Sequence, residues 1–216
     1  MIKQKTKEII KKILFRYTNL GSPTYSYNLE PLQLTEIINS LEKVKNFRGN
    51  ICEIGVARGM TSRFICEYLK DLKKQPKFYC IDTYDSFVSE DINYEIKNRN
   101  KTDSELKGFS YNNFDKWKKN FRNFKFVEAI KTDVKKFEFK NIGPIKFALL
   151  DVDLYLPTLS ALNNLKENMV DGGILVVDDV ADDNSWDGAN QAFKEFVEKN
   201  SLKHKLVGKK CGVIEF

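Results

Sequence analysis

The sequence predicts an α/β fold in which helices cover both faces of a doubly wound, mostly parallel sheet. Three observations support this class. Strand-like and helix-like segments alternate over most of the 216 residues, as in repeated strand–helix–strand units. The strand segments are nearly continuous apolar runs, which is typical of strands buried on both faces. A turn with two glycines, 53–59, joins the first strand to a helix, where such sheets usually bind a ligand.

The elements follow one another in a clear order. Gly21-Ser22-Pro23 breaks the chain, and we expect 1–26 to be a basic helical extension and 27–216 the domain. Apolar runs predict strands at 50–56, 77–83, 124–130, 145–153 and 172–180. Periodic patterns predict helices at 30–45, 60–74, 156–169 and 190–200. Two short strands around 208–210 predict an antiparallel hairpin at the C-terminus.

One segment, 84–115, interrupts this alternation. It is polar, mixed in charge and unusually long for a loop of a compact domain. Its aromatic side chains suit a lid that packs over a bound ligand, whereas a mobile surface loop is the plainer alternative. These aromatic residues are Phe87, Tyr94, Phe109, Tyr111 and Phe114.

The net charge of +6 is concentrated at the N-terminus, where residues 1–17 hold six basic side chains against Glu8 alone. The remainder is nearly neutral, which argues against a nucleic-acid-binding domain. The basic residues are Lys3, Lys5, Lys7, Lys11, Lys12 and Arg16. Between them, Ile2, Ile9, Ile10, Ile13 and Leu14 have the spacing of an amphipathic helix. Such a helix can face solvent, contact another subunit of a homo-oligomer, or lie on a membrane surface.

The cysteines and the hydropathy suggest a compartment. Cys52, Cys66, Cys80 and Cys211 lack the spacing of metal ligands, and we expect buried free thiols in a reducing environment. The sequence has neither a run of about 18 apolar residues that could span a membrane nor a signal-peptide pattern. We therefore expect a cytoplasmic protein.

The turn Glu53-x-Gly55-x-x-x-Gly59 and the acid that ends the second strand predict a nucleoside site. Glycines allow the backbone to approach a ligand, and the lack of a three-glycine pattern lowers the case for NAD. Asp82 can accept hydrogen bonds from both hydroxyls of a ribose, although an aspartate there can also cap a turn. Together the two features favour an adenosine-type ligand.

Acidic residues end two further strands. Asp151 ends the fourth strand, and Asp178 and Asp179 end the fifth. If these strands are neighbours, their carboxyl ends lie about 4.8 Å apart at one rim of the sheet. Converging carboxylates favour a divalent cation, and oxygen-only ligation is typical of Mg²⁺ or Mn²⁺. The alternative is that these acids cap the following helices and face water.

The acidic pattern resembles a known family. The match to macrocin O-methyltransferases extends over roughly residues 28–200, is most specific within 151–179, and includes the turn at 53–59. Its residues include Asp151-Val152-Asp153-Leu154-Tyr155, Pro157-Thr158, Gly172-Gly173, Asp178-Asp179 and Trp186-x-Gly188-Ala189. The resemblance implies a Rossmann-like class I methyltransferase sheet, S-adenosylmethionine and Mg²⁺ as cofactors, and methylation of a sugar hydroxyl.

The resemblance also implies roles for single residues. The implied cofactor site consists of Glu53, Gly55, Gly59, Asp82, Thr132 and Asp133. The implied ligands of Mg²⁺ are Asp151, Asp178 and Asp179. Members of the family typically act on natural products or glycans, so the resemblance implies a sugar, free or nucleotide-linked, as the acceptor.

The general base is left open by this comparison. Related enzymes that methylate catechols have a lysine where this sequence has Leu154, and macrocin-type enzymes are thought to use a histidine. His204 is the one histidine here, and it falls in the predicted edge hairpin. The candidates are therefore Asp153 first, then Asp182 and Asp183, with Tyr155 as a weaker one.

Two other functions compete with methyl transfer. An Asp-x-Asp after an apolar strand, here Asp151 and Asp153, also holds the metal and nucleotide sugar of many glycosyltransferases. Those enzymes need neither the glycine turn nor the second acidic pair. The missing lysine and the misplaced histidine also fit a nucleoside-binding subunit without catalysis. A nucleic-acid methyltransferase fits least, because the basic charge is confined to the first helix.

Overall fold

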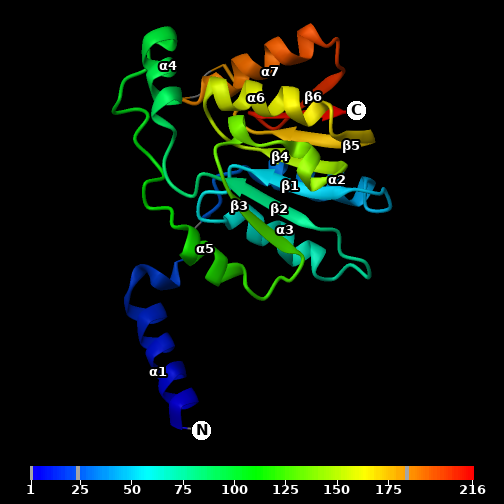
Figure 1. Cartoon of the computed structure of the whole chain (residues 1–216). Helices are drawn as coiled ribbons and strands as arrows, with labels where there is room; N and C mark the ends of the chain where they lie inside the picture. Colours follow the sequence, from blue (N-terminus) through cyan, green and yellow to red (C-terminus); the bar gives the residue numbers. More distant parts are fainter. Residues whose placement is uncertain (1, 23–24, 183–184) are drawn as a thin grey trace.

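The computed structural model describes residues 2–22, 25–182 and 185–216. In this part of the chain, one sheet of seven strands has the order β3-β2-β1-β4-β5-β7-β6 (Figure 1). Strands β1 to β5 are parallel, whereas β7 runs antiparallel to both β5 and β6. The doubly wound, mostly parallel sheet with an antiparallel C-terminal hairpin is therefore confirmed.

The element boundaries are as follows. The strands are β1 Asn50–Ile54, β2 Phe78–Asp82, β3 Val127–Lys131, β4 Ile145–Leu150, β5 Met169–Val177, β6 His204–Val207 and β7 Cys211–Glu215. The α-helices are α1 Ile2–Tyr17, α2 Pro31–Lys43, α3 Met60–Leu69, α4 Ser89–Arg99, α5 Phe114–Phe121, α6 Tyr155–Lys166 and α7 Asp187–Lys199. Short 3₁₀ helices are η1 Asn19–Gly21, η2 Val134–Lys136 and η3 Phe139–Ile142.

Helices cover both faces of the sheet, as the apolar strands require. On one face, α2, α3 and α5 bury side chains such as Ile37, Ile65 and Trp117. On the other face, α6 and α7 bury side chains such as Leu162 and Phe196. Successive strand residues alternate between these two apolar clusters, because side chains of a strand point to opposite faces. The four cysteines are buried and free, as expected.

The strand order reverses between β1 and β4. Helices from opposite faces diverge at such a point, and the crevice beyond the carboxyl ends of the strands is where doubly wound sheets bind ligands. Gly55 follows β1 and Asp151 follows β4 at this reversal, and their backbones touch closely. The topology therefore brings the glycine turn and the first acidic residue to the same position.

Several boundaries differ from the sequence prediction. The helix expected over 60–74 ends at Leu69, because the backbone N–H of Leu72 turns back to the carbonyl of Leu69 at 3.1 Å. Strand β1 ends at Ile54, since Gly55 adopts φ +82° and leaves the extended conformation. The segment 84–115 contains a regular helix, α4, and the start of α5. Helix α4 lies beside α6.

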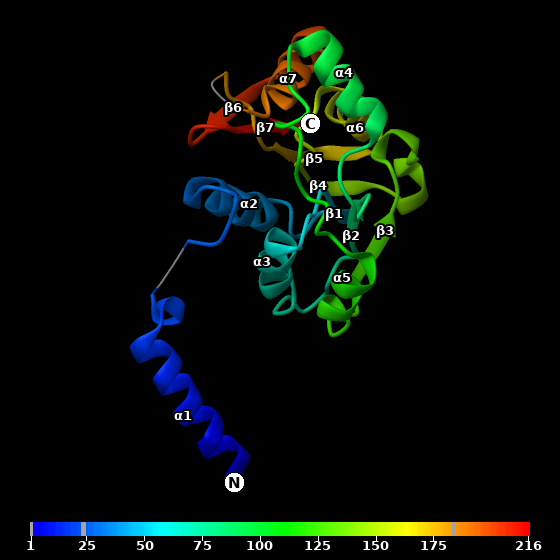
Figure 2. The same ribbon diagram turned by 90° about the vertical axis from the view of Figure 1, so that its left-hand side faces the viewer.

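Helix α1 stands away from the sheet domain in both views (Figures 1 and 2). Its closest packing partner is η1, where Gly21 lies against the carbonyl of Phe15. None of the helices in the described ranges is both long enough and apolar enough to cross a membrane.

Candidate active site

A cavity of about 1010 Å³ opens at the carboxyl ends of the central strands. Most of the site residues expected from the sequence line it. These are Glu53, Gly55, Asp82, Thr132, Asp133, Asp151, Asp153, Asp178, Asp179 and Asp182. Gly59 is not part of the lining, and Asp183 lies outside the described residues. The topology thus brings ligand-binding and acidic candidates to one rim.

Glycine is needed at the two positions of the turn because of different neighbouring atoms. At Gly55, with φ +82°, an added Cβ would lie 1.7 Å from the carbonyl oxygen of Asp151. At Gly59, with φ +88°, it would lie 2.7 Å from the indole nitrogen of Trp117. Both positions require glycine for conformation and for close packing. Gly59 therefore accommodates an aromatic side chain of α5, a contact that the sequence pattern does not reveal.

Asp82 is tied to the backbone of the glycine turn. Its Oδ2 accepts the N–H groups of Val56 at 2.7 Å and Ala57 at 3.2 Å, and its Oδ1 accepts the N–H of Tyr84 at 2.5 Å. Burial raises the pKa of Asp82, whereas these backbone hydrogen bonds act in the opposite direction. Asp82 lines the cavity and also holds the turn in shape. Its role toward a ribose stays a prediction.

Glu53 and the pair Thr132 and Asp133 lie on either side of Asp82. Glu53 is 1% exposed, and burial raises its pKa to about 8. This shift favours the protonated form of its carboxyl group at neutral pH. Asp133 begins η2 by accepting the N–H of Lys135 at 3.0 Å. The N–H of Thr132 donates to the carbonyl of Asp82 at 2.9 Å.

Three carboxylates converge beyond β4 and β5. Oxygens of Asp151, Asp153 and Asp179 all lie within 4.8 Å of one another. The two strands are parallel neighbours with Leu150 opposite Val177, so the residues that follow them meet at one rim. Asp153 and Asp179 adopt φ +63° and +60°. Non-glycine residues with positive φ are uncommon and occur often at functional sites.

Asp178 points to a different set of partners. Its Oδ1 accepts the side-chain amide of Gln33 at 2.5 Å, and its Oδ2 accepts the ammonium of Lys210 at 3.0 Å. Lys210 also donates to Asp179 at 2.7 Å. The structure thus groups Asp153, which we expected as a base, with Asp151 and Asp179, while Asp178 faces α2 and the turn between β6 and β7.

The cluster is electrostatically unfavourable without compensation. Burial raises the pKa of Asp151 well above its ordinary value, and the neighbouring carboxylates of Asp178, Asp153 and Asp179 raise it further. Burial and Asp179 raise the pKa of Asp153 in the same way. Lys210 acts against these shifts. A divalent cation fits this donor set, because it offsets like-charge repulsion and prefers oxygen ligands.

Lys210 itself is not a proton acceptor. Burial lowers its pKa, but the carboxylates of Asp178 and Asp179 outweigh burial and leave the pKa above its ordinary value. The lysine therefore stays charged. Its backbone carbonyl accepts the N–H of Val180 at 2.8 Å, which holds the turn of the hairpin against the acidic segment.

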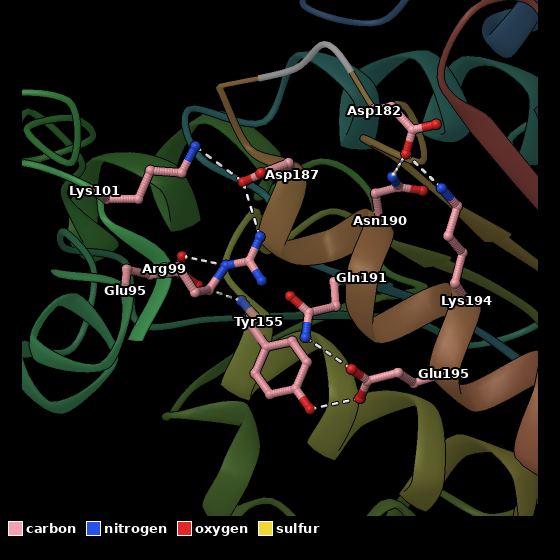
Figure 3. Close-up of polar contacts among 10 residues, drawn as sticks. All are labelled: Glu95, Arg99, Lys101, Tyr155, Asp182, Asp187, Asn190, Gln191, Lys194 and Glu195. Carbon is pink, nitrogen blue, oxygen red and sulfur yellow. Dashed lines mark hydrogen bonds and ion pairs between the residues drawn. The ribbon is translucent and has the colours of Figure 1, made fainter. Parts of the chain in front are cut away.

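The other candidates for the base differ in their surroundings. Asp182 accepts hydrogen bonds from Lys194 and from Asn190, and these lower its pKa (Figure 3). The hydroxyl of Tyr155 donates to Glu195 at 2.6 Å, and this bond together with burial raises its pKa to about 12. His204 is exposed in β6 and packs edge-on against Phe193. Asp153 is thus the candidate nearest the acidic cluster.

Polar contacts of Glu95 and Arg99 connect α4 to the first residues of α6 and α7 (Figure 3). Arg99 lies 2.8 Å from Glu95 and 2.9 Å from Asp187, and its side chain is 9% exposed. Glu95 also accepts the N–H of Tyr155, the first residue of α6, at 2.8 Å. Because α6 begins directly after the acidic segment and α7 begins at Asp187, these contacts position both helices beside the cavity.

Aromatic residues of the insertion meet the start of α7 at the cavity wall. The ring of Phe87 lies 5.3 Å from that of Phe109 and 5.5 Å from that of Trp186. All three residues line the cavity, together with Tyr111. Sequence reasoning included the two phenylalanines in a lid. It did not place Trp186 at the wall.

Gln33, Lys210 and the pair Glu95 and Arg99 are site residues that sequence reasoning missed. Gln33 and Asp178 are 145 positions apart in the chain. For Lys210, the basic pair at 209–210 is a local sequence signal, but such a pair is equally typical of a solvent-exposed turn. For the others no sequence signal was available.

Comparison with known proteins agrees with this geometry. Residues 23–210 match the family described as Macrocin-O-methyltransferase (TylF). No curated protein sequence matches the chain. The solved structures that resemble this chain have low sequence identity to it, so their similarity supports the fold alone.

Three solved structures illustrate that likeness. The calicheamicin methyltransferase CalS11 is 16% identical, with a TM-score of 0.68 over 85% of this chain and 78% of the other. The O-methyltransferase NovP is 19% identical, with a TM-score of 0.66 over the same shares. SMU.1697c, a putative methyltransferase from Streptococcus mutans in complex with SAH, is 16% identical, with a TM-score of 0.54 over 87% and 99%.

The family match covers most of the domain, and the mostly parallel sheet is the fold expected of such an enzyme. The chain therefore belongs to the macrocin-O-methyltransferase family and is an S-adenosylmethionine-dependent O-methyltransferase.

Proposed function

We propose that this enzyme methylates a hydroxyl group of a sugar, free or linked to a nucleotide or natural product, with the help of Mg²⁺. One observation carries the proposal. The carboxylates of Asp151, Asp153 and Asp179 converge at the rim where the glycine turn meets β4. CalS11, which shares the fold, is described as a TDP-rhamnose 3'-O-methyltransferase, and this description supports a sugar acceptor.

The cofactors supply two kinds of chemistry. When bound, S-adenosylmethionine supplies an electrophilic methyl group on its sulfonium. A bound Mg²⁺ supplies positive charge that lowers the pKa of a nearby hydroxyl. Residues of this chain do the rest: they hold the cofactors, orient the acceptor, exclude water and accept the proton.

We assign the cation to Asp151 and Asp179 and the proton transfer to Asp153. Asp153 lies within the same group of oxygens, so an acceptor hydroxyl beside the cation is within its reach. Asp178, the third ligand expected from the sequence, keeps Gln33 and Lys210 beside the cluster. A buried carboxylate so close to the cation contributes to the field whether or not it coordinates.

The cofactor lies, in this proposal, between the glycine turn and β3. Gly55 lets the turn approach the methionine part, while Asp82 and the pair Thr132 and Asp133 face the nucleoside part. Alignment of the acceptor oxygen with the methyl group accounts for much of the rate gain, since effective molarities of well-oriented groups reach about 10⁵ M or more. The aromatic wall formed by Phe87, Phe109 and Trp186 acts as a lid that excludes water and packs on the sugar.

A panel assay tests the proposal. The enzyme is incubated with labelled S-adenosylmethionine and a set of sugar nucleotides and glycosides, with Mg²⁺ or with excess EDTA. We expect transfer to at least one sugar hydroxyl and its loss in EDTA. Full activity in EDTA would show that no divalent cation takes part.

A variant pair refines this assay. Asp179→Asn removes a ligand and should abolish transfer, while S-adenosylmethionine still binds in a calorimetric titration. Asp171→Asn is the matched control, because Asp171 is an exposed aspartate at the opposite end of the same strand. Equal loss in both variants contradicts a specific role for the rim.

The family match favours methyl transfer over the glycosyltransferase alternative. A thermal-shift comparison separates them, since a methyltransferase is stabilised by S-adenosylmethionine and a glycosyltransferase by UDP- or GDP-sugars. A subunit without catalysis would bind S-adenosylmethionine and transfer no methyl group to any acceptor.

A further inference from the structure

Helix α1 exposes an apolar surface that the sheet domain leaves uncovered. Ile9, Ile10 and Ile13 are 51–58% exposed, and Leu14 is 38% exposed. Both views show the helix extending away from the domain (Figures 1 and 2). Four large aliphatic side chains on one short helix are costly to leave in water, and a surface of this kind usually marks an interaction.

The helical repeat gathers these residues on one side. With 3.6 residues per turn, Ile9, Ile10, Ile13, Leu14 and Tyr17 share a face of α1. We call these five residues the apolar face. The tyrosine lies at the end of this face and is 73% exposed. Aromatic residues with one polar end are enriched where a bilayer meets water.

Basic residues border the apolar face. Lys5 and Arg16 lie along one edge and Lys7 along the other, while Lys11 and Lys12 point to the opposite side. Long basic side chains beside an apolar stripe can keep their charges at the level of lipid headgroups while the stems cover apolar surface. This is the arrangement of helices that lie in the plane of a membrane.

The positive charge of α1 favours an anionic lipid surface over a second copy of the helix as the partner of the apolar face. The segment 1–17 holds six basic residues and one acidic residue, Glu8. Two copies paired through their apolar faces would bring these basic edges together, and like charges at such distances repel. An anionic lipid surface, in contrast, attracts each lysine and arginine close to it. The helix is also too short and too charged to cross a bilayer.

We propose that α1 binds the surface of a bilayer that contains anionic phospholipid. The apolar face inserts between the acyl chains, the basic edges contact lipid phosphates, and the methyltransferase domain is held beside the membrane. This inference does not depend on the sugar acceptor or on Mg²⁺, since α1 contributes no residue to the lining of the cavity.

A vesicle flotation assay with the full chain tests the inference. One set of vesicles is phosphatidylcholine alone, and the other contains about one quarter phosphatidylglycerol. We expect the protein to float with the anionic vesicles and not with the neutral ones. Raising the salt concentration from about 0.1 M to about 0.5 M should lower binding several-fold, because salt screens the basic edges.

Two single substitutions distinguish the apolar face from general hydrophobicity. Ile13→Ser removes a side chain of the face, and we expect a loss in vesicle partitioning of about tenfold or more. Phe15→Ser is the matched control, because Phe15 is equally exposed, at 56% against 52%, and points to the opposite side. We expect a change within about twofold. Circular dichroism confirms that both variants keep their helix content.

Three results would overturn the inference. Absence of binding to anionic vesicles excludes a membrane surface, and equal loss in the two variants excludes a role for the apolar face. The third result is that light scattering shows a homo-oligomer of the natural chain, that Ile13→Ser dissociates it, and that the natural chain does not bind vesicles. That outcome would assign the face to a second copy of the chain. Methyl transfer to a soluble acceptor is expected to be unchanged in Ile13→Ser, so a failure here is distinct from a failure of the proposed function.

Discussion

Single residues of the acidic rim are held in unusual states. Asp153 and Asp179 adopt left-handed backbone conformations, which cost energy for residues other than glycine. Burial raises the pKa of both Asp151 and Asp153, and neighbouring carboxylates, among them Asp178 and Asp179, raise it further. The fold tolerates these costs at the rim where we propose that the reaction takes place, and such perturbed groups are typical of catalytic sites.

Replacement of Asp153 tests its role as the base. Asp153→Asn keeps the shape of the side chain and removes its ability to accept the proton. We expect kcat to fall by about 10² to 10⁴, while the Mg²⁺ concentration for half-maximal activity changes little. Steady-state kinetics over a Mg²⁺ series measures both. A large rise in the Mg²⁺ requirement with a recoverable kcat would instead make Asp153 a ligand.

Replacement of Glu53 tests whether the pKa of this buried carboxyl group is raised in the folded protein. Its pKa is raised by burial from 4.5 to about 8 in the folded protein, so the folded state binds more protons than the unfolded state between these values. Stability from this group therefore falls as pH rises through that window. Glu53→Gln removes the effect, which amounts to a few kcal/mol at most.

The measurement for Glu53 is the free energy of unfolding from about pH 5 to about pH 8. We expect the curve of the natural protein to fall more steeply than that of Glu53→Gln, with the variant relatively more stable at the alkaline end. Parallel curves would mean that Glu53 has an ordinary pKa in the folded state.

Among the elements, α4 changes how the insertion 84–115 is understood. The sequence allowed a lid or a mobile loop. In the structure Glu95 of α4 accepts the backbone N–H of Tyr155, which begins α6, and Arg99 of α4 pairs with Asp187, which begins α7 (Figure 3). The aromatic residues that line the cavity, Phe87 and Phe109, precede and follow α4 in the chain, and their rings lie 5.3 Å apart. Any closing motion therefore concerns the segments flanking α4 more than α4 itself.

Arg99→Met tests this anchoring. It removes the charge that pairs with the buried carboxylate of Glu95 and with Asp187, whose side chain is 35% exposed, and breaking a buried pair from one side costs about 3–5 kcal/mol. We expect chemical denaturation to report a loss of this size. Lys43→Met is the matched control, because its pair with Glu215 is exposed on both sides at 54% and 53%, and such pairs contribute about 1 kcal/mol or less. Similar losses in both variants would contradict the buried anchor.

On the scale of the whole molecule, a sheet domain with two apolar layers is joined to a separate helix. The core is formed by residues from Leu29 onward, and the described side chains of α1 are exposed. We therefore expect the domain to be stable without α1.

Removal of residues 1–22 tests this division. We expect calorimetry to show a Tm within a few degrees of the full chain, because little apolar surface of the core is lost. Methyl transfer to a soluble acceptor should persist. A fall in Tm of more than about 10 °C would show that α1 packs against the domain in solution.

The sequence by itself determined the kind and order of the elements. Continuous apolar runs predicted buried parallel strands, and the fixed hand of their connections places all carboxyl ends at one rim. That was enough to bring Asp82, Asp151, Asp178 and Asp179 to the edge of one sheet. These patterns are local or follow from chain topology, so they can be recognised without coordinates.

Only the tertiary structure decided which side chains at the rim meet. Asp153 turns toward Asp151 and Asp179, whereas Asp178 turns toward Gln33 and Lys210. The direction of a side chain beyond a strand end depends on one or two backbone angles, such as the positive φ of Asp153 and Asp179. Its partners come from segments far away in the chain. Sequence periodicity predicts neither the direction of these side chains nor their distant partners, because both are set only when the folded elements pack together.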